Sequence, residues 1–370
     1  MIIKDFRVYH ISKKLNPALP NAVYSLEYIE HVFLELDTDM YTGVGMAYTF
    51  NTVQAEAMKL LVEGYCRNLI GKDPSLIRAH WQAAQCTMGG CGQTGLPMSA
   101  YAVVDTALWD LVAQEAGKPL YKLLGAKTDR LPVYGSGGWL VPQEDMIQEA
   151  LWFQSQGYTK YKLKLGFPDW RIDVERLTAL RKAVGDDFEI MVDVNQGWSV
   201  KQALEVIPFL RELGITYLEE PLHCQDFKGN AQLAAATDIM ICSGECLFTT
   251  KEIFELLRLG GADYINPDLM RCGGVTEYIQ ICALAGAFRV PVTAHVLMEV
   301  SAHVLAASPT GGLLEHIPDW WNGAFAQAPV VEKGWLKLLD VPGLGIRFDH
   351  DYIQLSLIHI SEPTRLGMIS

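Results

Sequence analysis

The stretch YTKYKLKLG, from Tyr158 to Gly166, alternates lysines with aromatic and apolar residues and predicts a β-strand. Because side chains two residues apart on a strand share a face, Lys160, Lys162 and Lys164 form one row. A solvent-facing lysine row is ordinary on an edge strand, where it discourages aggregation. A row that points into the protein requires anionic partners, because an unpaired buried charge is very costly. The surrounding strands decide between the two.

Short apolar runs like this one recur at regular intervals along the second half of the chain. They are LPVYGSGG (131–138), YKLKLG (161–166), EIMVDVN (189–195), ITYLEEP (215–221), DIMICSGE (238–245), DYINPD (263–268), PVTAHV (291–296) and GLLEH (312–316). Helical stretches such as DVERLTALRKAVG and VKQALEVIPFLRELG separate most of them. Buried strands that alternate with helices indicate a parallel sheet, and eight of them favour a closed barrel. We therefore expect an α/β fold, a (β/α)7β TIM-like barrel, over residues 129–330.

The first 128 residues follow a different pattern. Three strand-like runs, IIKDFRVYHI, YIEHVFLELDTD and GVGMAYTF, predict an antiparallel meander. From residue 53 to about 125 the spacing becomes helical, with an apolar stripe from Ala100 to Val112 and a stop at Gly117–Pro119. A small α+β domain over residues 1–128 is the prediction.

The composition of the chain limits the kinds of molecule that it is expected to bind. The formal charge of −13, without any basic run, argues against nucleic acid. The uncharged segment from Trp81 to Val104 is too rich in glycine, glutamine and threonine to span a membrane. The beginning of the chain lacks the apolar core of a signal peptide, and no CxxC pair occurs among the eight cysteines. We expect a cytoplasmic protein with reduced cysteines in its core.

The tail from Leu355 to Ser370 shows neither barrel nor helix periodicity. Its first part, LSLIHISEPTR, matches one reading frame of a transposase-end sequencing adapter. We interpret residues 355–370 as an adapter-derived scar and exclude them from the fold prediction.

Ionisable residues stand at the ends of successive predicted strands. Asp193 and Glu219 are 26 residues apart, Glu219 and Glu245 are 26 apart, Glu245 and Asp268 are 23 apart, and Asp268 and His295 are 27 apart. Each step is one βα unit, so every strand delivers one such residue to the end of the barrel where active sites lie. Singly, each has a structural explanation, such as a strand terminus or a hydrogen-bonded histidine. Their repetition at matching points favours a site. The whole set is Lys162, Lys164, Asp193, Asn195, Glu219, Glu245, Asp268, His295 and Glu315.

The chemistry of this set is that of a hard metal ion and two bases. Asp193, Glu219 and Glu245 are all oxygen ligands, which suit Mg²⁺, with Mn²⁺ as second choice. Together with Lys162 and Lys164, a divalent ion makes the pocket net positive, so that it favours a carboxylate and favours its enediolate more. We predict that Lys162 lowers the pKa of Lys164 and makes it a base. Across the barrel, Asp268 orients His295 as an acid or base.

The order KxK, DxN, EEP, GE, PD, AH and LEH resembles the mandelate racemase subgroup of the enolase superfamily, over about residues 1–354. Enzymes of that superfamily use a Lys or His base together with Mg²⁺, which stabilises an enediolate. The resemblance implies Mg²⁺ on Asp193, Glu219 and Glu245, Lys164 as one base assisted by Lys162, His295 with Asp268 as the other, and Glu315 hydrogen-bonded to the enolate oxygen.

The resemblance also implies how the site is covered. The cap is expected to take in the end of the chain, residues 331–354, and to close over the substrate through loops 14–25 and 45–55. Polar residues of the first loop region are candidate substrate contacts: Lys13, Lys14, Asn21 and Tyr24. A homo-oligomer is expected as well.

Three functions follow from this set. If His295 protonates a leaving β-hydroxyl, the enzyme is a dehydratase of a sugar acid. If His295 returns the proton to carbon, it is a racemase or epimerase of a 2-hydroxy acid. The segments VYGSGGW, AQLAAATD and LLEHIPDW are similar to acid-sugar dehydratases of the galactarate/talarate type, which favours the first. A non-catalytic barrel that only binds sugar acids is the third, and the intact lysines and histidine argue against it.

Overall fold

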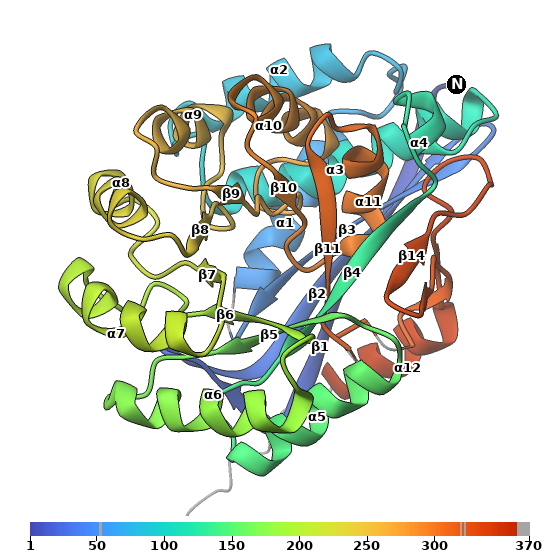
Figure 1. The fold of residues 1–370 in the computed structure, drawn as a ribbon. Helices are drawn as coiled ribbons and strands as arrows, with labels where there is room; N and C mark the ends of the chain where they lie inside the picture. The colour runs from blue at the N-terminus through green and yellow to red at the C-terminus, as the bar shows by residue number, and fades with distance from the viewer. Residues whose placement is uncertain (52–53, 319, 322, 361–370) are drawn as a thin grey trace, which may run out of the picture.

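The computed structural model describes residues 1–360 except 52–53, 319 and 322 (Figure 1). Two sheets organise it. An antiparallel sheet from the beginning of the chain lies across one end of a closed parallel barrel. The predicted barrel with an α+β cap is confirmed.

The cap sheet is the expected meander. Strands β1 (Ile3–Pro20), β2 (Ser25–Thr38) and β3 (Thr42–Phe50) pair in the order β1-β2-β3, antiparallel throughout. Helices follow from residue 54 onward: α1 (Gln54–Arg67), α2 (Ile77–Met88), α3 (Leu96–Glu115) and α4 (Leu120–Leu123).

Helix α3 joins the cap to the barrel and is buried on nearly all sides rather than along one stripe. On one side it packs so closely on β3 that a Cβ atom at Gly45 would lie 1.9 Å from the carbonyl oxygen of Val103. On the other side the indole of Trp109 donates to Thr276 Oγ1 of the barrel (2.9 Å). The apolar stripe predicted from the sequence is therefore wider in the structure, because two partners cover the helix.

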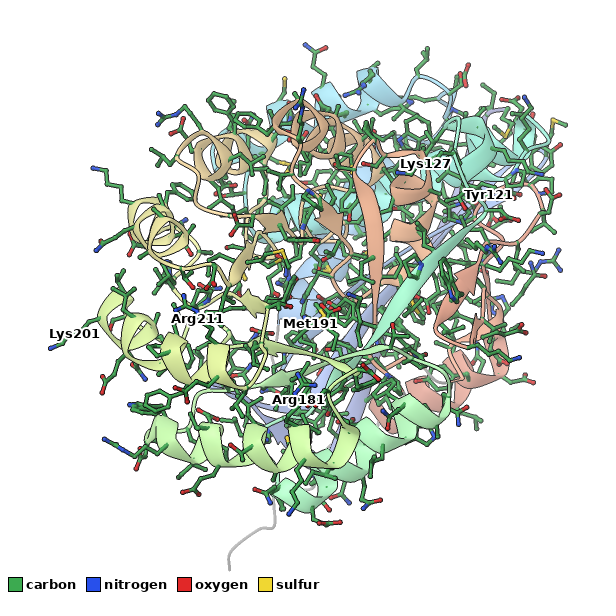
Figure 2. The ribbon with its side chains drawn as sticks, viewed as in Figure 1. Tyr121, Lys127, Arg181, Met191, Lys201 and Arg211 are labelled. Carbon is green, nitrogen blue, oxygen red and sulfur yellow. The ribbon has the colours of Figure 1, made fainter. Side chains whose placement is uncertain are left out.

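Among the described residues, eight parallel strands form the barrel, and β11 closes it on β4. The strands are β4 (Arg130–Gly137), β5 (Lys160–Lys164), β6 (Glu189–Asp193), β7 (Tyr217–Glu219), β8 (Met240–Ser243), β9 (Tyr264–Ile265), β10 (Val292–Thr293) and β11 (Gly311–His316). The connecting helices are α5 (Gln143–Ser155), α6 (Trp170–Val184), α7 (Val200–Glu212), α8 (Phe227–Ala236), α9 (Thr250–Arg258), α10 (Val275–Phe288) and α11 (Met298–Ala307). Lys201 and Arg211 of α7 point outward, whereas Met191 of β6 lies inside the ring of strands (Figure 2).

The end of the chain touches both parts. Strand β14 (Trp335–Lys337) extends the barrel sheet antiparallel to β4, and β13 (Val331–Glu332) pairs antiparallel with β14. Strand β12 (Phe325–Gln327) pairs with β15 (Arg347–Phe348). Helix α12 (His350–Ile360) then packs on β1 of the cap, where His350 Nε2 lies 3.1 Å from Glu35 Oε1.

Helix α12 corrects one expectation about the tail. Residues 355–360 continue this helix, although the sequence shows no helical periodicity there. No glycine or proline interrupts the segment HDYIQLSLIHI, so an existing helix extends through it. Residues 361–370, the rest of the proposed scar, lie outside the described residues.

Two further properties bear on function. No helix in the described ranges is long and apolar enough to cross a membrane. The structure describes all eight cysteines as free thiols; five are buried as expected, but Cys86 and Cys91 are exposed and Cys246 is half-buried.

Substitution of Gly45 by Ala tests the contact between α3 and β3. The added methyl group meets backbone that cannot rotate away, so we expect a loss of about 1–3 kcal/mol in the free energy of unfolding, measured by chemical denaturation. Gly64→Ala in α1 is the matched control, because a Cβ there meets nothing within 4 Å. It should stabilise the helix by about 0.5–1 kcal/mol. Equal denaturation midpoints for wild type and Gly45→Ala would contradict the packing described.

Candidate active site

The carboxyl ends of the barrel strands bring the predicted residues together. Lys164, Asp193 and Glu219 are register partners on three adjacent strands, β5, β6 and β7, so their side chains share the inner face. The remaining members follow or end the other strands. All eight ionisable residues are buried: Lys162, Lys164, Asp193, Glu219, Glu245, Asp268, His295 and Glu315.

The three lysines of the predicted row do not all face the site. Lys162 contacts Glu219 and lies 2.9 Å from Glu315 Oε1, and Lys164 contacts Asp193. Lys160, at the beginning of β5, is instead half-exposed and pairs with Glu189. Two of the three lysines therefore face a buried anionic site, and the third does not.

An aromatic ring lies next to the ammonium group of each of the two inward-facing lysines. The Lys162 ammonium lies 5.2 Å from the ring centroid of Tyr134, and that of Lys164 lies 5.3 Å from Trp139. Tyr134 belongs to a buried layer that fills the barrel beneath the site, with Met191, Tyr217 and Cys242. Such cation–π contacts stabilise charges that have lost their water.

Three carboxylates form a candidate metal centre. Oxygen atoms of Asp193, Glu219 and Glu245 lie within 4.8 Å of one another, and all three groups are buried. Asn195 orients the first of them, because its backbone N–H donates to Asp193 Oδ1 (2.7 Å) and its Nδ2 to Oδ2 (3.1 Å). A donor set made only of oxygen fits Mg²⁺.

The charges of the site shift the pKa values of its members. Burial raises the pKa of Glu219 to about 7, although Lys162 acts in the opposite direction. For Asp193 the two lysines outweigh burial, so that its pKa falls below the ordinary value. The pKa of Glu315 is also lowered, because Lys162 and His295 outweigh its burial. An ionised Glu315 only accepts hydrogen bonds, so the donation to an enolate oxygen that the resemblance implies requires its protonated form.

The charges of the protein alone raise the pKa of Lys164, and the predicted lowering, which included a metal ion nearby, stays a prediction. Burial does lower this pKa, and Lys162 lowers it further, but the carboxylate of Asp193 outweighs both and raises the pKa of Lys164 above its ordinary value. The prediction considered the neighbouring lysine and a cation. It did not place the Asp193 carboxylate in direct contact with the ammonium group.

On the other side of the barrel, His295 and Asp268 form the expected pair. His295 Nδ1 lies 2.8 Å from Asp268 Oδ2, which leaves Nε2 facing Glu245 Oε2 at 3.2 Å. Burial lowers the pKa of His295, but Glu245 and Asp268 outweigh it and raise the pKa. When Nε2 carries a proton, that proton faces Glu245.

Backbone strain accompanies these residues. Asn195, Glu220 and Val296 have φ angles of 45°, 37° and 55°, in the left-handed region that side chains other than glycine rarely adopt. Val296 is β-branched, which makes its conformation the most costly of the three, and its N–H donates to Glu315 Oε2 (2.9 Å). These strained conformations lie directly after the strand ends. They change the direction of the backbone there and so set the positions of the residues that line the site.

Two residues that the sequence did not single out belong to the site. The hydroxyl of Tyr48, from cap strand β3, donates to Asp268 Oδ2 (2.5 Å) and lies 3.3 Å from His295 Nδ1. Arg271 lies 3.4 Å from Glu245 Oε1 and 3.6 Å from Asp268 Oδ2. Arg271 follows Asp268 by three residues, which is a usable signal for a strand-end loop. Nothing in the βα repeat points to Tyr48, because it comes from the cap.

The predicted loop residues of the cap divide into two groups. Tyr24 lines a cavity of about 640 Å³ together with Tyr48 and Arg271, and the charges of Arg271, Glu245 and Lys164 act on its hydroxyl. Asn21 shapes this turn, since its Oδ1 accepts from the N–H groups of residues 23 (2.9 Å) and 24 (2.8 Å).

Lys13 and Lys14 lie farther back on β1, where the exposed Lys14 sits over the ring of Tyr28 (5.9 Å) and Lys13 faces Ile29 across the sheet. Ala22, in the turn between β1 and β2, packs against the end of the barrel where the site lies. A Cβ at Gly166 or Gly197 would lie 2.3 or 2.7 Å from its methyl group. The turn between β1 and β2 therefore covers the ends of β5 and β6, whereas residues 14–20 of the predicted capping loop belong to strand β1.

Comparison with known proteins agrees with this geometry. Residues 145–352 match the family model described as enolase C-terminal domain-like, and residues 5–125 match the N-terminal domain of mandelate racemase and muconate lactonizing enzyme. The chain is 34% identical to L-talarate/galactarate dehydratase of Salmonella typhimurium over 309 residues, which are 83% of this chain and 77% of that one.

Solved structures show the same fold. A racemase from Streptomyces coelicolor with bound magnesium superimposes with a TM-score of 0.92 at 30% identity, covering 96% of this chain and 99% of that one. L-talarate dehydratase from Polaromonas sp., complexed with Mg and L-glucarate, superimposes with a TM-score of 0.88 at 31% identity, covering 94% and 95%. The chain belongs to the enolase superfamily, in its mandelate racemase subgroup.

Proposed function

We propose that this protein is a Mg²⁺-dependent dehydratase of a sugar acid. It removes the proton α to a carboxylate and eliminates the β-hydroxyl as water. The observation that carries the proposal is the placement of two buried proton-transfer groups, Lys164 and His295, on β5 and after β10, with three carboxylates between them. A substrate carboxylate bound there through a metal ion would have Lys164 on one side and His295 on the other.

Each residue then has a defined task. When Mg²⁺ is bound to Asp193, Glu219 and Glu245, it supplies a Lewis acid that stabilises negative charge on the substrate carboxylate. Lys164, in its neutral form, takes the α-proton, and the electron pair left on carbon is delocalised into the carboxylate. Lys162 stays protonated between Glu219 and Glu315, and its positive charge favours the more anionic intermediate.

The second half of the reaction belongs to His295. Asp268 fixes its tautomer and orientation, so that Nε2 holds the proton on the substrate side. The electron pair on the α-carbon forms the new double bond, the bond to the β-hydroxyl breaks, and His295 protonates the leaving oxygen to give water. The resulting enol then becomes a 2-keto-3-deoxy acid.

Features of the cap support a polyhydroxylated substrate. The cavity between cap and barrel is lined by polar residues, among them Tyr24, Asn51 and Arg271, and by apolar ones such as Phe50 and Phe248. The polar residues offer hydrogen-bonding groups to substrate hydroxyls. The similarity to L-talarate/galactarate and L-talarate dehydratases points to the same class of substrate.

A racemase or epimerase of a 2-hydroxy acid is the second candidate. It uses the same residues, except that His295 returns a proton to the α-carbon, and the Streptomyces coelicolor racemase shares the fold. A panel of sugar acids incubated in D₂O distinguishes the two. Formation of a 2-keto-3-deoxy acid supports the dehydratase, whereas deuterium at the α-carbon without net elimination supports the racemase.

Loss of a metal-binding carboxylate should abolish turnover. We expect Glu219→Gln or Glu245→Gln to lower kcat by roughly 10³-fold or more, because the metal contributes several kcal/mol of transition-state stabilisation. EDTA should have the same effect, and added Mg²⁺ should reverse it. Glu189→Gln is the control, since Glu189 pairs with Lys160 away from the site. Full turnover of either site variant, or of metal-free protein, would exclude the mechanism.

The two proton-transfer groups can be separated by substitution. His295→Asn should stop elimination, with a loss of about 10²–10⁴-fold, while Lys164 still exchanges the α-proton of one substrate configuration with D₂O. Lys164→Ala should remove that exchange as well. NMR of the recovered acid measures both. Lys160→Ala, on the same strand but outside the site, should leave exchange and turnover unchanged. Undiminished exchange in Lys164→Ala would show that this lysine is not the base.

The hydrogen bond from the Tyr48 hydroxyl to Asp268 of the Asp268–His295 pair gives a third prediction. Tyr48→Phe keeps the ring contacts with Phe50 (5.2 Å) and Trp320 (5.9 Å) but removes the hydrogen bond to Asp268. A hydrogen bond to a charged group contributes about 1.5–3 kcal/mol, so kcat should fall about 10- to 100-fold with little change in melting temperature. Tyr9→Phe removes a comparable hydroxyl that donates to Glu35 in the cap sheet (3.0 Å) and should leave kcat unaltered. Equal kcat values for the two variants would remove Tyr48 from the site.

A further inference from the structure

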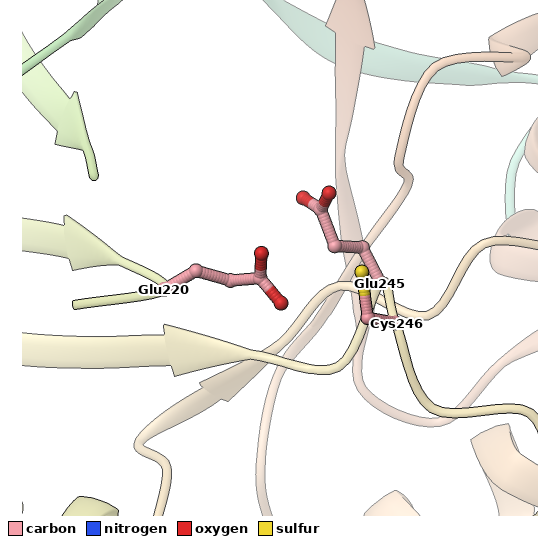
Figure 3. A group of neighbouring side chains, drawn as sticks. All are labelled: Glu220, Glu245 and Cys246. Atoms are coloured by element: carbon pink, nitrogen blue, oxygen red, sulfur yellow. The ribbon is translucent and has the colours of Figure 1, made fainter. Parts of the chain in front are cut away.

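A second group of ligand atoms adjoins the three-carboxylate site. Carboxylate oxygens of Glu220 and Glu245 and the sulfur of Cys246 lie within 4.8 Å of one another. Figure 3 shows the two carboxylates turned toward each other, with the Cys246 sulfur beside Glu245. Glu245 is common to both groups. Glu220 and Cys246 have no task in the reaction proposed above.

Glu220 has an oxygen that needs a partner. Its side chain is 1% exposed, and Gln196 Nε2 donates to its Oε2 (3.0 Å). Its Oε1 is buried and has no hydrogen-bond partner among the described residues. Figure 3 shows this carboxylate aimed at Glu245 and Cys246. A buried carboxylate with an unpartnered oxygen is costly in its ionised form, and burial together with the nearby Glu245 raises the pKa of Glu220 well above its ordinary value. A cation between the two carboxylates would favour the ionised form instead.

The backbone holds Glu220 in this direction. Along a regular strand, its side chain would point away from the face that Glu219 occupies. Its φ angle of 37° ends the strand conformation at this residue. The chain is pinned on both sides, because the Glu220 N–H donates to Cys242 O (2.9 Å) and its carbonyl accepts from the N–H of Gln196 (2.7 Å). A strained conformation at a buried carboxylate is typical of a functional position.

Sulfur gives the second group a different preference from the first. Mg²⁺ takes oxygen ligands, whereas thiolates select softer ions such as Zn²⁺. A second thiol, the buried Cys224, lies close to Cys246, which makes this side of the site rich in sulfur. Two positive groups lie nearby, but on the side of Glu245: Arg271 Nη1 donates to the Cys246 sulfur (3.5 Å), and His295 Nε2 lies 3.2 Å from Glu245 Oε2. Among the described residues neither forms an ion pair with Glu220.

We propose that Glu220, Glu245 and Cys246 form a second divalent-cation site, selective for a thiophilic ion such as Zn²⁺ and coupled to the Mg²⁺ site through Glu245. On binding, the Cys246 thiol releases its proton to solvent and the sulfur bonds to the metal. The two sites differ in ligand chemistry, so they accept different ions. The proposal does not depend on which reaction the protein catalyses.

Co²⁺ is the probe, because a thiolate ligand gives it a near-ultraviolet charge-transfer absorption that oxygen ligands do not give. Full-length protein with Cys86→Ser and Cys91→Ser removes the two exposed thiols and serves as the reference. A non-thiol reductant keeps Cys224 and Cys246 reduced. We expect the charge-transfer absorption to saturate at one Co²⁺ per chain. Stoichiometric Zn²⁺ should remove this absorption, whereas an excess of Mg²⁺ should leave it unchanged.

Two variants in that background decide the proposal. Cys246→Ser should abolish the absorption, and Glu220→Gln should keep it but weaken Co²⁺ binding at least about tenfold, since one ligand charge is lost. Circular dichroism checks that each variant is folded; if Cys246→Ser is not, the Co²⁺ affinity of Glu220→Gln still decides. An unchanged absorption in Cys246→Ser, or an unchanged affinity in Glu220→Gln, overturns the proposal. Because the readout is spectroscopic, a failed test on sugar acids leaves this result unaffected.

Discussion

The rest of the structure depends on one electrostatic constraint: buried carboxylates and two ammonium groups must share the centre of the barrel. Lys162 and Lys164 extend from β5 toward Asp193, Glu219 and Glu315, and all five groups are buried. Removing either lysine leaves a carboxylate without its ion-pair partner in a medium of low dielectric. The strand register, the aromatic layer under the lysines and the strained loops after the strands all serve to hold these groups in contact.

The cap completes this arrangement from outside the barrel. Helix α3 lies between the cap sheet and α10, so the two parts share one continuous packed core. This contact fixes β3, and β3 carries Tyr48 to the Asp268–His295 pair. Acid–base chemistry at one side of the barrel is thereby joined to the position of the cap, while the metal-binding side is built by the barrel alone.

Much of this could be predicted from the sequence, because periodicity encodes it. The spacing of about one βα unit located Asp193, Glu219, Glu245, Asp268 and His295 without any structural knowledge. Contacts that cross between the two domains have no such signature, which is why Tyr48 escaped prediction. The contact between Asp193 and Lys164, which raises the pKa of this lysine in the protein alone, was also missed, because spacing along a strand does not define which of several nearby charges make contact. The helix at residues 355–360 was missed because it continues a preceding helix rather than showing a period of its own.

The contact of Ala22 with Gly166 and Gly197 restricts how cap and barrel can be combined. A methyl group on the loop occupies the space that side chains at those two positions would need, so loop and barrel mouth are complementary in shape. Tyr48 adds a chemical condition to this steric one. A hybrid protein that joins this barrel to the cap of a relative therefore needs a small residue opposite the two glycines and a hydroxyl beside the histidine. Cap and barrel therefore act as a matched pair, and exchanging one alone would disturb both the steric fit and the environment of the histidine.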